Sequence, residues 1–470
     1  MPLHPDRLFD ANQHKRELAR ELYSNVRDLP ILSPHGHTDP RWFALNENFS
    51  NAAELLILPD HYVFRMLASQ GHTLDSLGIA KIDGSPVNTD YRKIWKIFAK
   101  NYSLFRGTPS QLWMDYVLNN VFKLEQVLCE SNADEFYDSI NTALASDAFR
   151  PCTLMDTFNI ELIATTEGAL DPLDHHSKIL KSEMRGRVIT TFRPDDVVDP
   201  DRPDFSDNVT QLGVLTGEAT NSWQGYLNAL ANRRQFFKQH GATATDHGHP
   251  SAVTADLTKP ECEALFVKCL NGTQNAEESE LFRGQMLTEM AGMSLDDGLV
   301  MQIHPGCFRN HNKHIFEVFG ADKGADIPLA TDYVHALHPL LNKYGNEASL
   351  SIIVFTLDET TYSRELAPMA GHYPALKLGP AWWFHDSPEG MLRYRQQVTE
   401  TAGFYNTVGF NDDTRAFLSI PARHDVARRI DCRFLADLVA EHRLDMASAH
   451  ELAADLTYNL AKKAYFGDDQ

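Results

Sequence analysis

The sequence contains no long hydrophobic run, no closely spaced pair of cysteines and no excess of positive charge. No stretch approaches the roughly 18 consecutive apolar residues that a membrane-spanning helix needs. The first thirty residues contain no basic segment followed by an apolar one, so we expect no secretory signal peptide. These absences predict a cytoplasmic protein without a membrane partner.

The few cysteines and the negative net charge exclude further classes of protein. The six cysteines are scattered without a CxxC pair, which is typical of reduced thiols in a cytoplasmic protein. The formal net charge is −21, and such a chain is repelled by the phosphate backbone of nucleic acids. We therefore expect no nucleic-acid partner, and an anionic ligand would need a local cluster of Arg or Lys.

What the sequence does contain is a repeated alternation of strand and helix patterns over 470 residues. Short apolar runs that end in polar residues recur eight times, and amphipathic helical segments separate most of them. The predicted strands are 31–37, 161–166, 187–193, 242–247, 299–304, 350–355, 375–379 and 407–410. Eight such signals favour an α/β fold of the closed (β/α)8 TIM-barrel type over an open doubly wound sheet.

The long interval between the first two predicted strands has a different character. Residues 39–158 carry many aromatics with helical spacing and no convincing strand. We interpret them as a helical insertion over the barrel mouth, so that residues 1–38 and 159–470 form the barrel. Residues 195–207 are rich in Pro and Asp and are predicted to form a solvated loop.

Candidate metal ligands follow the first and last predicted strands. His35 and His37 are two residues apart, a spacing that points both imidazoles to one face of a strand. Asp413 follows the eighth strand, which barrel closure brings beside the first. Two histidines and a carboxylate suit Zn²⁺ with an open coordination position. Asp413 could equally be the N-cap of a following helix.

Two arginines near strand ends are candidates to hold a carboxylate. Arg193 and Arg309 could each donate a two-pronged hydrogen bond to such a group, or could form structural ion pairs. Trp382 follows the seventh strand, where it could pack in the core or against a sugar ring.

Several motifs, taken together and in this order, resemble the uronate (glucuronate) isomerases, a branch of the amidohydrolase-like metal-dependent barrels. They are PILSPHGHTDP around His35, DHYVFRML around Tyr62, TFRPD at Arg193, TDHG at Asp246, QIHPGCFRNHN at His304, LKLGPAWWFHDSPEGM at Trp382 and VGFNDDTRAF at Asp413. No single motif is specific enough, but the set extends from about residue 30 to residue 420.

The resemblance implies interconversion of D-glucuronate with D-fructuronate, and of D-galacturonate with D-tagaturonate. One divalent ion, usually Zn²⁺, would be held by His35, His37 and Asp413. Tyr62 and Asp413, beside His35, would move a proton between C2 and C1 through a cis-enediol. The positions that would line the substrate pocket are His61, Arg193, Asp246, His304, Arg309, Trp382 and Arg415.

The chemistry fits these residue types, but alternatives remain. Forming an enediol needs a base and a stabilised oxyanion, and a Tyr with a lowered pKa could act as that base. The sixth strand ends in Phe355–Asp358 without a histidine, which disfavours the two-metal site of hydrolytic relatives. A mononuclear metal-dependent hydrolase and an inactive sugar-acid-binding barrel are the competing interpretations. A homo-oligomer is compatible with the sequence.

Overall fold

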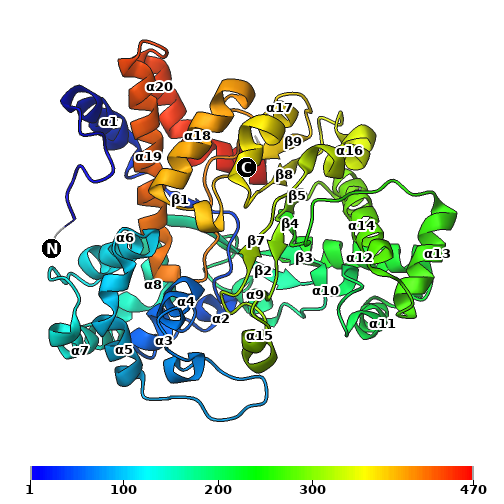
Figure 1. The fold of residues 1–470 in the computed structure, drawn as a ribbon, viewed down its shortest axis with the longest axis horizontal. Coiled ribbons are helices and arrows are strands. Elements are labelled where there is room, and N and C mark those ends of the chain that lie inside the picture. Colours follow the sequence, from blue (N-terminus) through cyan, green and yellow to red (C-terminus); the bar gives the residue numbers. More distant parts are fainter. Residues whose placement is uncertain (1–2, 468–470) are drawn as a thin grey trace.

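A computed structural model describes residues 3–467, and a curled parallel sheet lies at its centre (Figure 1). Its strands are β1 (Ile31–Ser33), β2 (Ile160–Gly168), β3 (Val188–Arg193), β4 (Ala244–His247), β5 (Val300–Ile303), β8 (Ile352–Val354) and β9 (Leu376–Leu378). They are hydrogen-bonded in that order, and every adjacent pair is parallel. Each overlaps a predicted strand.

The eighth predicted strand, residues 407–410, joins the sheet only by a bridge between Leu378 and Thr407. Its extended backbone ends at Gly409, whose φ of +74° is readily adopted only by glycine. A Cβ at this position would lie 3.1 Å from a backbone oxygen of the C-terminal helices. Close packing against those helices, rather than strand pairing, therefore fixes this segment.

The two ends of the curled sheet meet just after this segment. The amide of His37, beyond β1, donates a hydrogen bond to the carbonyl oxygen of Thr414 at 3.0 Å. The α/β barrel is thus confirmed, with its eighth strand reduced to a bridge.

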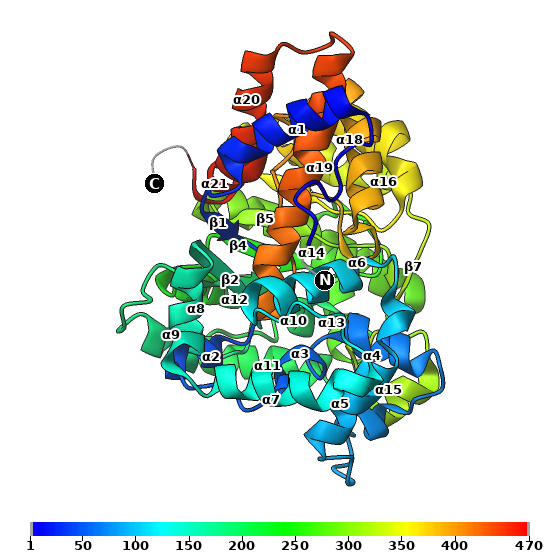
Figure 2. The same ribbon diagram turned by 90° about the vertical axis from the view of Figure 1, so that its left-hand side faces the viewer.

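Every described element between β1 and β2 is helical. The α-helices are α2 (Pro40–Leu45), α3 (Ala52–Leu56), α4 (His61–Ala68), α5 (Tyr91–Lys100), α6 (Pro109–Tyr116), α7 (Ala133–Leu144) and α8 (Pro151–Thr157). They gather at one end of the molecule (Figures 1 and 2). Their aromatic core, which includes Trp95 and Phe98, continues without a break into Ile31 and Ile160 of the barrel.

The barrel is surrounded by the helices that follow its strands. They are α9 (Asp174–Ile179), α11 (Phe205–Thr216), α12 (Trp223–Gln239), α13 (Lys259–Leu270), α14 (Ala276–Asp297), α15 (Lys313–Phe319), α16 (Tyr333–Tyr344), α17 (Ala367–Ala370) and α18 (Pro388–Ala402). Local signals set their bounds: Asp332 caps α16 and Ser387 caps α18 by accepting backbone N–H bonds. None of the helices within residues 3–467 is long and apolar enough to cross a membrane.

Two parts of the fold differ from expectation. A short antiparallel pair of strands, β6 (Cys307–Phe308) and β7 (Ile327–Pro328), was not predicted. The predicted solvated loop at residues 195–207 is confined to residues 199–204, because α10 (Asp195–Val198) buries Val197 and Val198 completely and α11 begins at Phe205. The first residue of α10, Asp195, is held by an ion pair with Arg193.

The chain ends pack together on the barrel. Helix α1 (Gln13–Val26) lies against α19 (Ile420–Ala440) and α20 (Met446–Ala454), with which it shares a small apolar cluster (Figure 2). The final helix, α21 (Leu460–Phe466), enters the interior of the barrel, where Ala461 packs against Leu32 and Ala164.

Candidate active site

A cavity of about 790 Å³ opens at the carboxyl ends of the strands, the end at which barrel enzymes carry their catalytic groups. It brings together every site residue predicted from the sequence. The residues in question are His35, His37, His61, Tyr62, Arg193, Asp246, His304, Arg309, Trp382, Asp413 and Arg415.

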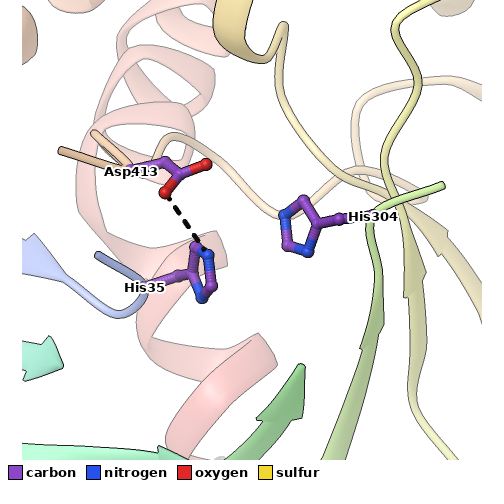
Figure 3. Close-up of side chains that lie close together, drawn as sticks. All are labelled: His35, His304 and Asp413. Atoms are coloured by element: carbon purple, nitrogen blue, oxygen red, sulfur yellow. Dashed lines mark ion pairs between the residues drawn. The ribbon is translucent and has the colours of Figure 1, made fainter. Parts of the chain in front are cut away.

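Three side chains at this end could hold a metal ion (Figure 3). Ligand atoms of His35, His304 and Asp413 all lie within 4.8 Å of one another. Asp413 Oδ1 is 3.5 Å from His35 Nε2 and 3.1 Å from His37 Nε2. The structure thus adds His304, which the sequence placed among the substrate-binding residues, to the cluster. His37 contacts Asp413 but lies outside the group of three.

Asp413 is held in an unusual conformation. Its φ is +37°, in the left-handed region that non-glycine residues rarely adopt. Oδ2 accepts a hydrogen bond from Trp382 Nε1 at 2.5 Å, while Oδ1 faces the histidines. Burial alone would favour the neutral acid, but His35 and His37 hold the pKa of Asp413 well below its usual range. The carboxylate is therefore ionised, and its Oδ1 is directed at the two histidines.

His304 is oriented by a buried chain of polar groups. Asp246 Oδ1 lies 2.6 Å from His304 Nδ1, and Arg193 Nη1 lies 3.1 Å from Asp246 Oδ2. The imidazole ring stacks on Phe355 and on His35, with centroid distances of 3.9 and 4.7 Å. Its Nε2 is buried and has no hydrogen-bond partner among residues 3–467. An orphaned, oriented nitrogen of this kind suits a metal ligand.

Helix α4 of the insertion carries Tyr62 and His61 into the cavity. Asp60 caps this helix by accepting the Tyr62 N–H at 2.9 Å. The Tyr62 ring packs edge-on to Trp113, and the guanidinium carbon of Arg423 lies 5.5 Å from its centroid. Burial raises the pKa of Tyr62 although Arg423 opposes the shift. The surrounding protein therefore does not supply the lowered phenol pKa considered above.

Three arginines converge near the mouth of the cavity. Arg415 Nη2 is 3.2 Å from Asp322, and Arg309 Nη1 is 3.0 Å from Asp326. Burial would raise the pKa of Asp322, but Arg415, Arg309 and Arg193 together lower it to about 2. Each arginine also pairs with a carboxylate of the chain, and together they stabilise the ionised Asp322.

Sequence reasoning missed several groups around this cavity. Asp322 and Arg423 carry charge at the site, yet neither belongs to a spacing pattern that would single it out. The glycines at 320 and 324, which both have positive φ, mark the loop that contains Asp322 and were its only visible signal.

A curled parallel sheet with His and Asp clustered at the strand carboxyl ends defines a barrel enzyme of the amidohydrolase type. A family model described as glucuronate isomerase matches residues 8–466. A uronate isomerase of Sphingopyxis alaskensis is 64% identical over 467 residues, covering 98% of each chain. One from Xanthomonas axonopodis pv. citri is 61% identical over 465 residues, covering 99% of this chain and 98% of its own. The chain belongs to the glucuronate isomerase family, and it is an isomerase.

Solved structures agree with this assignment. The crystal structure of glucuronate isomerase from Caulobacter crescentus superposes with a TM-score of 0.98 at 59% identity, covering 100% of this chain and 98% of that one. The uronate isomerase from Thermotoga maritima gives a TM-score of 0.91 at 26% identity, covering 99% and 100%. The fold predicted from the sequence is confirmed on this basis.

Proposed function

We propose that the enzyme interconverts D-glucuronate with D-fructuronate, and D-galacturonate with D-tagaturonate, in hexuronate catabolism. One observation supports this proposal above all: an arginine cluster that stabilises a carboxylate and a His/Asp cluster line the same cavity. The arginines suit the carboxylate at one end of a uronate. The His/Asp cluster suits the carbonyl end, where the proton moves.

The donor set fits one divalent ion, which we propose to be Zn²⁺. Imidazole nitrogens and a carboxylate oxygen are zinc ligands, and the unpartnered Nε2 of His304 adds a fourth candidate to His35, His37 and Asp413. A bound ion supplies Lewis-acid polarisation of the substrate's oxygens. The protein's part is to orient the ligands: Trp382 bonds Asp413, and Asp246 bonds His304.

Proton transfer between C2 and C1 is assigned to Tyr62 and Asp413, with His35 beside them. Burial raises the pKa of Tyr62, so the phenol enters the reaction protonated and acts first as an acid toward the substrate oxygen. Asp413, whose Oδ1 faces the cavity, is assigned as the acceptor of the C2 proton. Arg193, Arg309 and Arg415 bind the substrate carboxylate, and His61 borders the same space.

The proposal also covers the role of the helical insertion and the cellular location of the enzyme. Residues 39–158 cover the mouth of a barrel made by residues 1–38 and 159–470, and deliver Tyr62 through α4. All six cysteines are unpaired, which fits a reducing cytoplasm. The negative net charge fits a small-molecule substrate rather than nucleic acid. Light scattering would test whether the enzyme forms a homo-oligomer.

Steady-state rates on four sugars test the function. We expect ketose formation from glucuronate and galacturonate, and at least a hundredfold lower kcat/KM on glucose and galactose, because two charge-assisted hydrogen bonds are worth about 3 kcal/mol or more. Comparable efficiency on glucose would contradict the arginine assignment. Hydrolysis of a lactone or amide without ketose formation would favour the competing metal-dependent hydrolase.

A further inference from the structure

The C-terminal helix α21 forms the floor of the barrel, opposite the cavity. Tyr465 packs in one apolar cluster with Ala244, Val300 and Ile353, which lie at the amino ends or middles of β4, β5 and β8. The catalytic side chains follow the carboxyl ends of the same strands. Tyr465 is 3% exposed, so its hydroxyl must find a partner inside the barrel.

That partner links the floor to the candidate metal site. The Tyr465 hydroxyl lies 2.8 Å from Gln302 Oε1, and Gln302 Nε2 lies 3.4 Å from His35 Nδ1 and 3.3 Å from the carbonyl oxygen of Thr245. A His35 that binds a cation through Nε2 carries its proton on Nδ1, and this N–H needs an acceptor. With an ion bound, the Gln302 amide would therefore be turned, so that its oxygen accepts from His35 Nδ1 and its nitrogen donates to the Tyr465 hydroxyl. Gln302 is fully buried and His35 is 1% exposed. Because no water competes here, each bond restricts the next group along the chain.

Tyr465 also touches the segment that carries the other candidate ligand. Asn411 Nδ2 donates to the Tyr465 hydroxyl at 3.4 Å, and Asn411 stands two residues before Asp413. The neighbouring Gly409 allows this approach, because a Cβ there would lie 3.2 Å from the Ala461 nitrogen of α21. One hydroxyl group therefore contacts both polar segments that converge on the site.

We propose that Tyr465 is a positioning residue: acting through Gln302, it fixes the ring of His35 and so sets the affinity of the site for its metal ion. This inference rests on the proposed metal site. Without the Tyr465 hydroxyl, the Gln302 amide loses this partner and can rotate. Among the described residues, the Nδ1 of His35 then loses its hydrogen-bond partner, and the ring is held by packing against His304 and His37 and by its contact with Asp413. Groups that orient a ligand histidine in this way typically contribute about 10- to 100-fold in metal affinity or activity.

The test measures the zinc affinity of the purified full-length protein by competition with a chelator, together with kcat and the unfolding temperature of the metal-free form. Tyr465→Phe keeps the packed ring and removes only the hydroxyl, and Gln302→Met keeps the length of the side chain and removes its polar atoms. We expect the Kd for Zn²⁺ to rise about tenfold in Y465F and up to about a hundredfold in Q302M. Tyr458→Phe is the matched control, because its hydroxyl bonds Glu161 outside the barrel.

A double variant tests whether the effect of Tyr465 passes through Gln302. If Tyr465 acts through Gln302, Y465F in the Q302M background raises the Kd no further, because coupled groups are not additive. Additive effects would overturn the relay. A Y465F protein with lowered unfolding temperature but a zinc Kd within twofold of wild type would show a purely structural role and would also overturn it. Wild-type protein that binds no zinc would instead overturn the proposed metal site, and this inference with it.

Discussion

The two oxygens of the Asp413 carboxylate face different partners. Trp382 fixes Oδ2 and leaves Oδ1 to the histidines, so the indole decides how the carboxylate is turned. The indole also lies edge-on to His304, at 4.7 Å between ring centroids. Trp382 is thus a neighbour of two candidate ligands, Asp413 and His304.

We expect Trp382→Phe to lower kcat/KM by about 10- to 100-fold, the usual effect of losing a group that orients a ligand. Phenylalanine keeps much of the aromatic packing but cannot donate to Asp413. Steady-state kinetics with zinc in excess measure the effect. Trp223→Phe is the control, since Trp223 is buried in the outer helical core and should change stability alone. Equal activity of W382F and wild type would show that Asp413 needs no such support.

Glu167 is a second residue whose surroundings have a measurable consequence. It lies at the end of β2, hydrogen-bonded to Thr190 and 3.7 Å from His176. Burial raises its pKa from 4.5 to about 8. Below pH 4.5 the carboxyl group is protonated in the folded and unfolded chain alike. In that range it does not make the free energy of unfolding depend on pH.

Between pH 4.5 and about 8 the unfolded chain releases this proton while the folded chain keeps it. The free energy of unfolding should therefore fall by up to about 1.4 kcal/mol per pH unit in that window, relative to Glu167→Gln. Urea unfolding at pH 5, 7 and 9 measures the difference. Glu161→Gln, on the exposed face of the same strand, is the control. Parallel curves for wild type and E167Q would contradict the raised pKa.

At the scale of elements, α4 is the part of the insertion that reaches the chemistry. Tyr62→Phe should lower kcat by about 10²–10⁴ with metal still bound, because it removes a proton-transfer group. Exchange of the C2 hydrogen with solvent should slow in parallel. Tyr102→Phe removes another insertion hydroxyl, bonded to Asp115 at 2.7 Å, and should cost only about 1 kcal/mol of stability. Y62F activity within threefold of wild type would remove Tyr62 from the mechanism.

The loop between α15 and β7 places its own carboxylate among the arginines. Asp322 has a φ of +60° between two glycines of positive φ, and it pairs with Arg415. A uronate carboxylate that binds Arg415 would compete with Asp322 for this arginine. We expect Asp322→Asn to lower KM for glucuronate by about two- to fivefold, in line with an ion pair worth up to about 1 kcal/mol.

Glu317→Gln is the control for that variant, because Glu317 lies on the neighbouring helix α15 and pairs with Lys313. Its KM should match the wild-type value. A raised KM in D322N would mean that Asp322 helps to bind the sugar, through its hydroxyl groups, instead of competing with it.

Elements with a local signal were predictable from the sequence. Helices α16 and α18 lie where amphipathic segments separate predicted strands, and capping residues mark their starts. The strands were visible because apolar runs end in polar residues. Residues 407–410 carried the same signal, yet packing at Gly409 prevented a ladder. The groups that position the ligands, such as Gln302 and Tyr465, could not be predicted, since their contacts exist only in the folded chain.

At the scale of the whole molecule, the candidate ligands come from both ends of the barrel chain. His35 follows β1 and Asp413 follows the last strand segment, so a bound ion would tie together the seam at which the sheet closes. Zinc at a free concentration 100 times its Kd should raise the free energy of unfolding by about 2.7 kcal/mol. Thermal unfolding with a chelator and with added Zn²⁺ measures this shift.

Asp413→Asn serves as the control for metal removal, because it should abolish most of the zinc-dependent stabilisation while leaving the apolar cores unchanged. The same unfolding temperature for wild type with and without zinc would contradict a resident metal ion at the seam.

The floor made by α21 has a consequence for biosynthesis. Ribosomes translate every strand of the barrel before they reach this helix, yet Leu32 of β1 has Ala461 of α21 as a core neighbour. A nascent chain that has completed its strands therefore still exposes an apolar opening at the bottom of the barrel. Such exposure favours aggregation and recruits chaperones. The apolar interior can be fully packed, and the His35 ring held in its orientation, only after α21 has been translated.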